Sequence, residues 1–217
     1  MTKQNQSLLV NMAKKYQLEP TKFHNTIMET VMPSNGRTKV TESHVASFLI
    51  VANKYDLNPF TKEIYAYPAK SGGIQPIVSI DGWIKMVTSS DSFDGVRFKN
   101  KYDEEDKLIS VICTMHKKGC NHPIEVEEKL SECERPTEPW KKMPSRMLRH
   151  KAYIQAARLA FGLKTDMDQD EFERKQEMDI TASATIETCS NSSEKISDTL
   201  RHIEKEAEEE KRGIYLQ

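Results

Sequence analysis

"FDGVRFKNKYDEEDKLISVICTMHKKGCNHPIEVEEKL", residues 93–130, is the stretch that decides the fold predicted for this chain. Three segments of it, 93–102, 107–118 and 124–130, are rich in the β-branched and aromatic residues that strands favour. The polar joints between them, DEED and GCNHP, are too short for the helix that connects parallel strands. We therefore predict that these segments pair in an antiparallel sheet.

The residues before this stretch predict helices and two further strands. KEIYAYP (62–68) and IQPIVSI (74–80) are strand-like and flank the turn KSGG. The spacing of apolar residues predicts helices over 4–16, 20–32 and 41–57, and a short helix beginning near Asp81. Thr41 should cap its helix only partly, because His44 stands where a capping box has Glu or Gln, and Asp81 is expected as an N-cap. The predicted class is α+β, a small antiparallel sheet packed by helices behind a helical N-terminal segment.

A basic helix is predicted after the strands, at 145–162, with the sequence SRMLRHKAYIQAARLAFG. On a helical wheel its cations fall on two faces, with Arg146 and Arg149 on one and Lys151 and Arg158 on the other. Two apolar stripes separate these faces: Met147, Ile154 and Phe161, and Leu148, Ala152 and Leu159. The preceding Pro-containing segment, 134–144, is predicted to be a loop.

The cations of this helix need a partner or an exit to solvent, because burying an unpaired charge is very costly. One interpretation pairs them with carboxylates of the sheet or of the N-terminal helices. However, residues 137–164 hold seven Lys and Arg against a single acid, Glu138. This imbalance favours an external anion such as a phosphate chain, which rigidly held Arg and Lys bind well.

The charge of the whole chain is unevenly distributed. Its 217 residues hold 32 Lys and Arg and 33 Asp and Glu, but the segment 166–217 holds 7 of the former and 15 of the latter. The body up to residue 165 therefore carries a net charge of +7 and the tail −8. We predict a phosphate-binding domain at 1–177, a Ser/Thr-rich linker at 178–195 and an acidic helical tail at 196–217, which could bind a protein partner.

The absence of several sequence motifs narrows the class of protein. The chain has no G-x-x-x-x-G-K or G-x-G-x-x-G loop, which argues against ATP use, and no recognisable nucleophile motif. The four cysteines are scattered, the N-terminus lacks a secretion signal, and no apolar run is long enough to span a membrane. We expect a cytoplasmic protein with reduced thiols and no membrane association.

One constellation could bind a metal. Cys113, His116, Cys120 and His122 form the pattern C-x2-H-x3-C-x-H. Because Cys113 and His116 lie an odd number of residues apart on a predicted strand, their side chains should point to opposite faces, which disfavours zinc. Two alternative functions stay open. One is a metal-dependent nuclease that uses Asp81 with His116 or His122. The other is a protein-interaction module with a basic docking face.

Several long motifs, in unbroken order over about residues 41–177, resemble the phage Red-beta/RecT family of single-strand annealing proteins, the Bet-type recombinases. They are LIVANKYDLNPFTKEIYAYP, GIQPIVSIDGWIKMV, FDGVRF, NHPI and MLRHKAYIQAARLAFG. The resemblance implies an ATP-independent, non-enzymatic recombinase with a Rad52-like core, which binds single-stranded DNA and anneals complementary strands. It also implies homo-oligomeric rings or helical filaments in the bacterial cytoplasm, beside a phage 5′–3′ exonuclease and a host single-strand-binding protein. No cofactor is implied, although Mg²⁺ could assist annealing.

The resemblance further implies DNA-binding positions. They are Lys62, Lys70, Lys118, Arg146, Lys151 and Arg158, with Lys117 and Arg149 as plausible additions. Ser145 stands where the Red-beta branch has a lysine, and the loop at 133–140 is shorter and less basic, so each could weaken DNA binding. The segment after residue 178 matches poorly. One hypothesis is that the two basic faces of the helix serve different strands.

Overall fold

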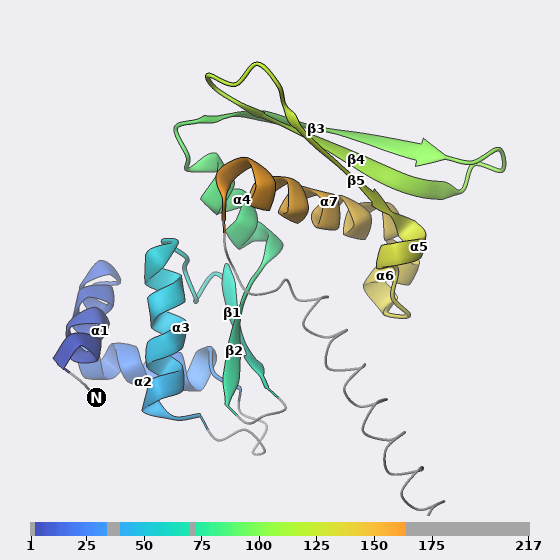
Figure 1. Ribbon diagram of the computed structural model, residues 1–217. Coiled ribbons are helices and arrows are strands. Elements are labelled where there is room, and N and C mark those ends of the chain that lie inside the picture. Colours follow the sequence, from blue (N-terminus) through green and yellow to red (C-terminus); the bar gives the residue numbers. More distant parts are fainter. Residues whose placement is uncertain (1–2, 34–39, 70–72, 164–217) are drawn as a thin grey trace, which may run out of the picture. The chain divides into compact units, whose positions relative to one another are not determined.

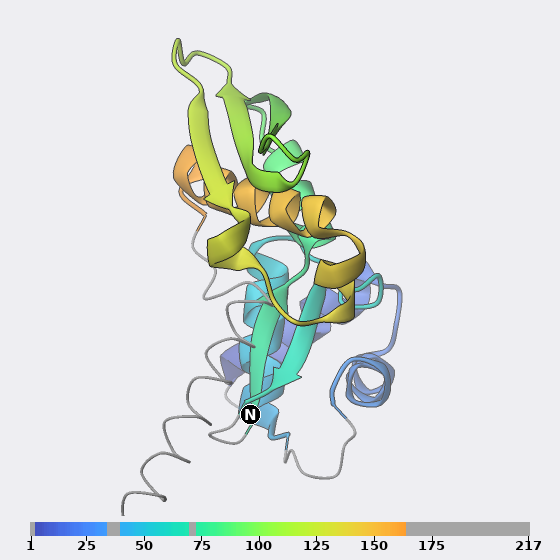
Figure 2. The same cartoon turned by 90° about the vertical axis from the view of Figure 1, so that its right-hand side faces the viewer.

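The central stretch forms a three-stranded antiparallel sheet in the computed structural model, which describes residues 3–33, 40–69 and 73–163. Its strands are β3 (Phe93–Tyr102), β4 (Leu108–Lys117) and β5 (Ile124–Lys129), in the order β3-β4-β5. The predicted strands and their antiparallel pairing are confirmed. Helix α7 (Pro144–Phe161) runs along one face of this sheet (Figure 1, Figure 2).

The α7 helix packs on the sheet through small and apolar side chains. On β4, Val111, Cys113 and Met115 are fully buried, and Leu148 and Ala152 of α7 are fully buried as well. The helix ends at Gly162, whose φ of 62° is one that glycine adopts at little cost. Leu159 was predicted in an apolar stripe with Leu148 and Ala152, but it is 66% exposed, so the stripe is not buried over its whole length.

A second sheet of two strands precedes the first. It pairs β1 (Ile64–Pro68) with β2 (Ile74–Val78), and the helix α4 (Ile80–Thr88) then leads into β3. The predicted α+β class with small antiparallel sheets is confirmed. The prediction that Asp81 caps α4 is wrong, because the side chain of Ser79 accepts a hydrogen bond from the Gly82 amide at 3.1 Å.

Three helices form the N-terminal segment: α1 (Lys3–Lys15), α2 (Pro20–Thr30) and α3 (Glu42–Lys54). Their ends differ little from the predicted ones. The partial cap predicted for α3 is wrong, because His44 takes the part of the expected Glu. Its Nδ1 atom accepts a hydrogen bond from the Thr41 amide at 3.1 Å, while the Thr41 hydroxyl accepts one from the His44 amide at 3.4 Å.

The segment predicted as a loop at 134–144 is partly helical. The short helix α5 (Leu130–Cys133) precedes it, and α6 (Glu138–Lys142) lies within it. Pro139 occupies the first turn of α6, where its missing amide hydrogen costs nothing, and Trp140 is buried. Prolines in this segment therefore lie in the first turns of helices α6 and α7, and not in an extended loop.

All described residues fall in one unit of the chain, Met1–Gln169. The helix predicted after residue 165, the linker at 178–195 and the tail at 196–217 lie outside the described residues. Within the described ranges, no helix is long and apolar enough to cross a bilayer.

Candidate nucleic-acid interface

The first half of α7 presents two arginines to solvent. Arg146 and Arg149 are exposed, and neither forms an ion pair or hydrogen bond with another residue of the described ranges. The first turn of α7 contains no acidic side chain. Since the amino end of a helix already carries a partial positive charge, two further cations make this end strongly electropositive.

These arginines border an open hollow of about 710 Å³ between α4, β3 and the start of α7. Its apolar lining consists mainly of Ile80, Ile84, Phe93, Val96, Phe98 and Tyr153. Its basic lining consists of Lys142, Arg146 and Arg149, with His150 beside them. An apolar floor beside cations is the combination with which proteins hold single-stranded nucleic acid, because the bases and the phosphates both find a partner.

The second basic face of α7 is turned toward the interior. Lys151 is only 7% exposed, so the prediction that both cationic faces reach solvent is wrong for this residue. The guanidinium of Arg158 lies over the ring of the buried Trp83 of α4, 5.5 Å from its centroid. Arg158 therefore joins α7 to α4, and a DNA contact by either residue stays a prediction.

Near the other end of α7, two consecutive lysines lie where β4 ends: Lys117 is its last residue and Lys118 the first of the following turn. Lys117 donates a hydrogen bond to the carbonyl of Ala160 at 2.7 Å, and its ammonium lies 5.2 Å from the Phe161 ring. It thus satisfies a carbonyl in the last turn of α7, where a positive charge is favourable. Lys118 is exposed on the turn that follows, so it is better placed than Lys117 to meet an outside anion.

Lys62 lies on the turn between α3 and β1. It is exposed, and its φ of 63° is in the left-handed region that non-glycine residues rarely adopt. The surrounding structure must therefore hold this turn in place. Lys70, predicted on the β1–β2 turn, lies outside the described residues.

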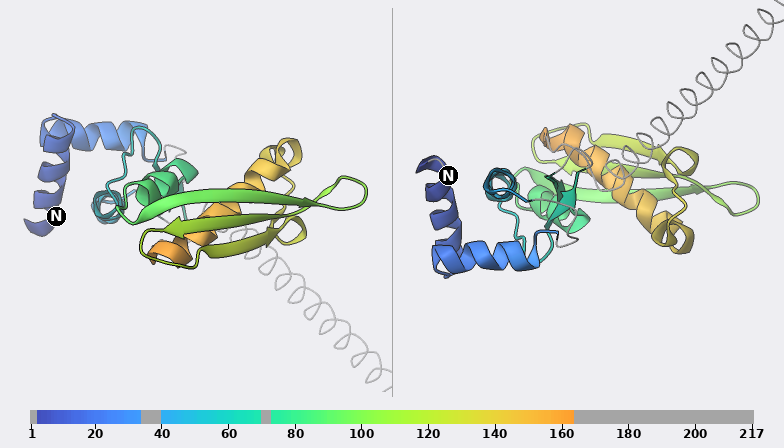
Figure 3. Two further views of the ribbon diagram at one scale, coloured as in Figure 1. Left: turned by 90° about the horizontal axis from the view of Figure 1, so that it is seen from above. Right: turned by 90° about the horizontal axis from the view of Figure 1, so that it is seen from below.

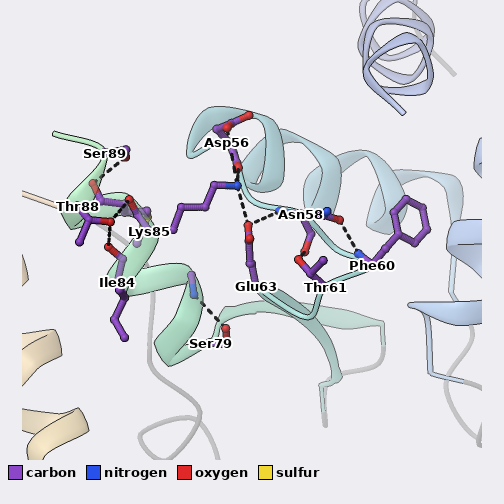
Figure 4. Close-up of polar contacts among 12 residues, drawn as sticks. Asp56, Asn58, Phe60, Thr61, Glu63, Ser79, Ile84, Lys85, Thr88 and Ser89 are labelled. Atoms are coloured by element: carbon purple, nitrogen blue, oxygen red, sulfur yellow. Dashed lines mark hydrogen bonds and ion pairs between the residues drawn. The ribbon is translucent and has the colours of Figure 1, made fainter. Parts of the chain in front are cut away.

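A network of charged side chains holds the turn that carries Lys62 (Figure 4). The carboxylate of Glu63 accepts hydrogen bonds from the Asn58 amide at 2.7 Å and from the Lys85 ammonium at 2.8 Å. Lys85 also donates to the Asp56 carbonyl at 2.5 Å, and Asp56 pairs with Lys15 of α1. The network therefore joins α1, the end of α3 and α4.

The carboxyl groups of this network titrate at low pH. Hydrogen bonding to Lys15, together with the nearby charge of Lys85, lowers the pKa of Asp56. Burial by itself raises the pKa of Glu63, but the hydrogen bonds from Lys85 and from the Asn58 amide outweigh it, so the pKa is lowered. Both groups are thus carboxylates at neutral pH, and they engage the cations nearby.

Sequence reasoning missed two further features of this region. Ser145 accepts a hydrogen bond from the Asn100 side chain at 3.0 Å and so connects α7 to β3. Arg97 and Lys99 of β3 are exposed cations on one face of the sheet. Their spacing of two residues in VRFKNKY was the available signal, since alternate residues of a strand share a face.

The metal candidate is not assembled by the fold. Cys113 is buried against α7, and burial raises the pKa of its thiol to about 12, so it stays protonated. Cys120 and His122 are exposed on the turn after β4. Across residues 3–33, 40–69 and 73–163, no three His, Cys, Asp or Glu side chains gather closely enough to hold an ion.

Two comparisons with known proteins bear on this interface. A model of the RecT family matches residues 21–185 of the chain, a range that includes α3 to α7 and every described strand. The recombination protein bet of Escherichia phage lambda is 41% identical over 167 residues. The match covers 72% of this chain and 60% of the lambda protein, so the chain spans less than two thirds of that relative's length.

Proposed function

This chain belongs to the RecT family, as its sequence motifs predicted, and on that premise we propose that it anneals complementary DNA strands. It binds single-stranded DNA without ATP, brings a second strand to it and holds the annealed duplex. The lambda relative is named a recombination protein, and we extend that process, homologous recombination, to this chain.

The observation that carries the proposal is the exposed pair Arg146 and Arg149 beside the apolar hollow. Neither arginine meets a carboxylate within the described ranges, so both are available to phosphates. The Ser145–Asn100 hydrogen bond and the buried Leu148 hold their helix on the sheet. A rigid helix places its guanidinium groups at a defined spacing, which suits the repeating charges of a nucleotide chain.

Annealing on this surface requires no covalent step. The arginines offset the repulsion between two phosphate chains, which is the main obstacle to bringing strands together. Contacts to the backbone carry little base information, so binding should depend weakly on sequence. The process needs no bound cofactor, and Mg²⁺ assists only by screening phosphates.

We extend the DNA contacts to the remaining cations that the family resemblance implies. They are Lys62, Lys70, Lys117, Lys118, Lys151 and Arg158. Of these, Lys62 and Lys118 are exposed in the structure. The two faces of α7 would serve different strands if Arg146 acts on one and Lys151 on the other. We also propose self-association into rings or filaments, action in the bacterial cytoplasm, and cooperation with a phage exonuclease and a host single-strand-binding protein.

A fluorescence annealing assay tests this function, with two complementary oligonucleotides, no ATP and a series of salt concentrations. We expect rapid annealing by the parent chain and at least about tenfold weaker single-strand binding by Arg146→Ala/Arg149→Ala. The slope of log affinity against log salt should become shallower by about 1.4, because each lost phosphate contact removes about 0.7 for a single strand.

The matched control is Lys14→Ala/Lys22→Ala, which removes two exposed cations from α1 and α2. Its slope of log affinity against log salt should stay close to that of the parent chain. Any small change would reflect only the lower net charge. Equal losses in both double variants would show that net charge acts instead of a defined surface. Strand cleavage that a chelator abolishes would support the nuclease alternative and contradict the proposal.

A further inference from the structure

The hollow beside Arg146 and Arg149 has two unlike sides. It lies between α4, β3 and the start of α7, and the two helices are on the same side of the three-stranded sheet (Figure 1, Figure 3). The start of α7 supplies its cations, whereas α4 and β3 supply mainly apolar side chains. Among the described residues that line it there is no carboxylate. An anion can therefore bind on the α7 side, and an uncharged apolar group on the other.

The apolar side of the hollow is formed before any ligand binds. Ile84 on α4 and Val96 on β3 are 41% and 36% exposed, so apolar surface faces water there. Tyr153 on α7 also lines the hollow, yet it is only 5% exposed, and its ring centroid lies 6.4 Å from that of Phe98. Core packing therefore fixes this part of the lining. The volume of about 710 Å³ is within the range of small-molecule pockets, about 300–1,000 Å³.

A nucleobase of the bound strand fits both sides. Its two faces are flat and largely apolar, and its sugar is linked to a phosphate on either side. Arg146 and Arg149 lie about one helical turn apart, so they can hold two neighbouring phosphates of one strand. The base between those phosphates then lies beside the apolar side chains. Lys142 contributes less, because it already pairs with Glu138 at 3.1 Å.

The hydroxyl groups of the hollow suit the edge of a base without selecting one base. Thr88 donates its hydroxyl hydrogen to the Ile84 carbonyl at 2.8 Å, so its oxygen can still accept a hydrogen bond. Ser145 accepts from Asn100, so its hydroxyl can still donate. One acceptor and one rotating donor match polar groups on every base, so occupancy of the hollow should tolerate any sequence.

We propose that the hollow binds one nucleobase of a single strand, turned out of its stack, while Arg146 and Arg149 hold the adjoining phosphates. A base in the hollow cannot pair, so pairing with a complementary strand must withdraw it. The hollow therefore favours unpaired over paired DNA, and annealing includes the release of this base. The inference rests on the proposed single-strand binding and deepens it.

Two oligonucleotides of equal length, one of thymine nucleotides and one of abasic nucleotides, test the proposal. They carry the same number of phosphates, so the ratio of their affinities reports base contacts alone. We expect the parent chain to bind the thymine strand at least about fivefold more tightly, the lower end of what one stacked base contributes. Ile84→Gln/Val96→Gln should lower that ratio to about twofold or less, while abasic affinity and the salt slope stay close to the parent values.

The matched control is Ile50→Gln/Ile109→Gln, which changes two isoleucines that are 51% and 47% exposed and lie outside the hollow. It should keep the parent ratio. Val96→Thr preserves the shape of valine and should also lower the ratio, so it decides the matter if the double variant loses abasic binding through misfolding. The proposal is overturned if the parent ratio is near one, if the hollow variants keep it, or if the control loses it equally.

A photoreactive base locates the binding position directly. An oligonucleotide with one thiothymine base should crosslink, on irradiation, to residues of α4, β3 or α7 that line the hollow, as mass spectrometry of the peptides identifies. The complementary strand should reduce the yield at least about fivefold, because the base leaves the hollow to pair. Crosslinks confined to other regions, or a yield that pairing leaves unchanged, would contradict the proposal. Protection of the hollow by an acidic, apolar peptide alone would assign it to a protein partner.

These measurements separate the inference from the proposed function. If the parent chain anneals strands with a steep salt dependence but shows no preference for bases, the hollow has no base-binding role and the function stands. If the parent binds neither oligonucleotide, the proposed function itself fails. The Ile84→Gln/Val96→Gln chain should still anneal strands, since its phosphate contacts are intact.

Discussion

Two regions of the molecule differ in whether their positively charged side chains contact carboxylates. Around the turn that carries Lys62, the side chain of Lys85 is one third exposed, and its ammonium contacts both Glu63 and Asp56 (Figure 4). At the start of α7, Arg146 and Arg149 are exposed and have no acidic neighbour within the described ranges. We call the first the paired region and the second the open region.

The difference teaches which positive charges stabilise the fold and which are available for a ligand. A half-buried ion pair with several hydrogen bonds holds elements together, and removal of one partner leaves a poorly solvated charge. An exposed arginine without a partner contributes little to stability. Sequence position alone does not separate these two cases, since Lys85, Arg146 and Arg149 all lie on predicted helices.

The largest effect that we expect in the paired region comes from Gly82→Ala. A Cβ atom at this position would overlap the backbone carbonyl oxygen of Glu63, and backbone cannot move aside as a flexible side chain can. The substitution should lower the free energy of unfolding by about 3 kcal/mol, the upper end of the usual cost of overpacking. Chemical denaturation measures it, and a loss below about 0.5 kcal/mol would show that α4 does not rest on this turn.

A matched pair of substitutions compares the two regions directly. Lys85→Met should cost about 2 kcal/mol in unfolding free energy, because Glu63 then loses its charged donor while it remains largely buried. Arg149→Met removes a cation of similar length from the open region and should change stability by less than about 0.5 kcal/mol. Of the two substitutions, only Arg149→Met should directly weaken the binding of single-stranded DNA. Equal destabilisation by both would remove the distinction between the regions.

Acidification should produce the smallest effect, and of the two regions it acts on the paired one, because that region contains Asp56 and Glu63. Because the pKa values of Asp56 and Glu63 are lowered in the folded chain, they contribute stability above their ordinary values and lose it as the pH falls through the lowered ones. Stability should therefore decline below about pH 4.5. The difference between the parent chain and Lys85→Met should narrow over the same range. A difference that is constant from pH 6 to pH 3 would contradict this account.

Much of the fold could be predicted from local pattern. The strands at 93–102 and 124–129 and the helix that ends at Gly162 follow from alternation, short joints and a terminal glycine, all of which are local properties. The cap of α4 was misassigned because Ser79 and Asp81 are both good N-cap residues, and only the course of the backbone chooses between them. The helix α6 was missed because prolines can mark either a loop or a helix start.

The sequence by itself determined the α+β class, the order of the elements and the concentration of positive charge in and around the basic helix. These properties depend on residues that are near neighbours in the chain. The tertiary structure alone decided that Lys151 is buried, that Lys117 bonds the end of α7, and that Arg146 and Arg149 stay exposed. The exposure of a charge depends on which face of its helix packs against the sheet, and contacts between distant segments settle that orientation.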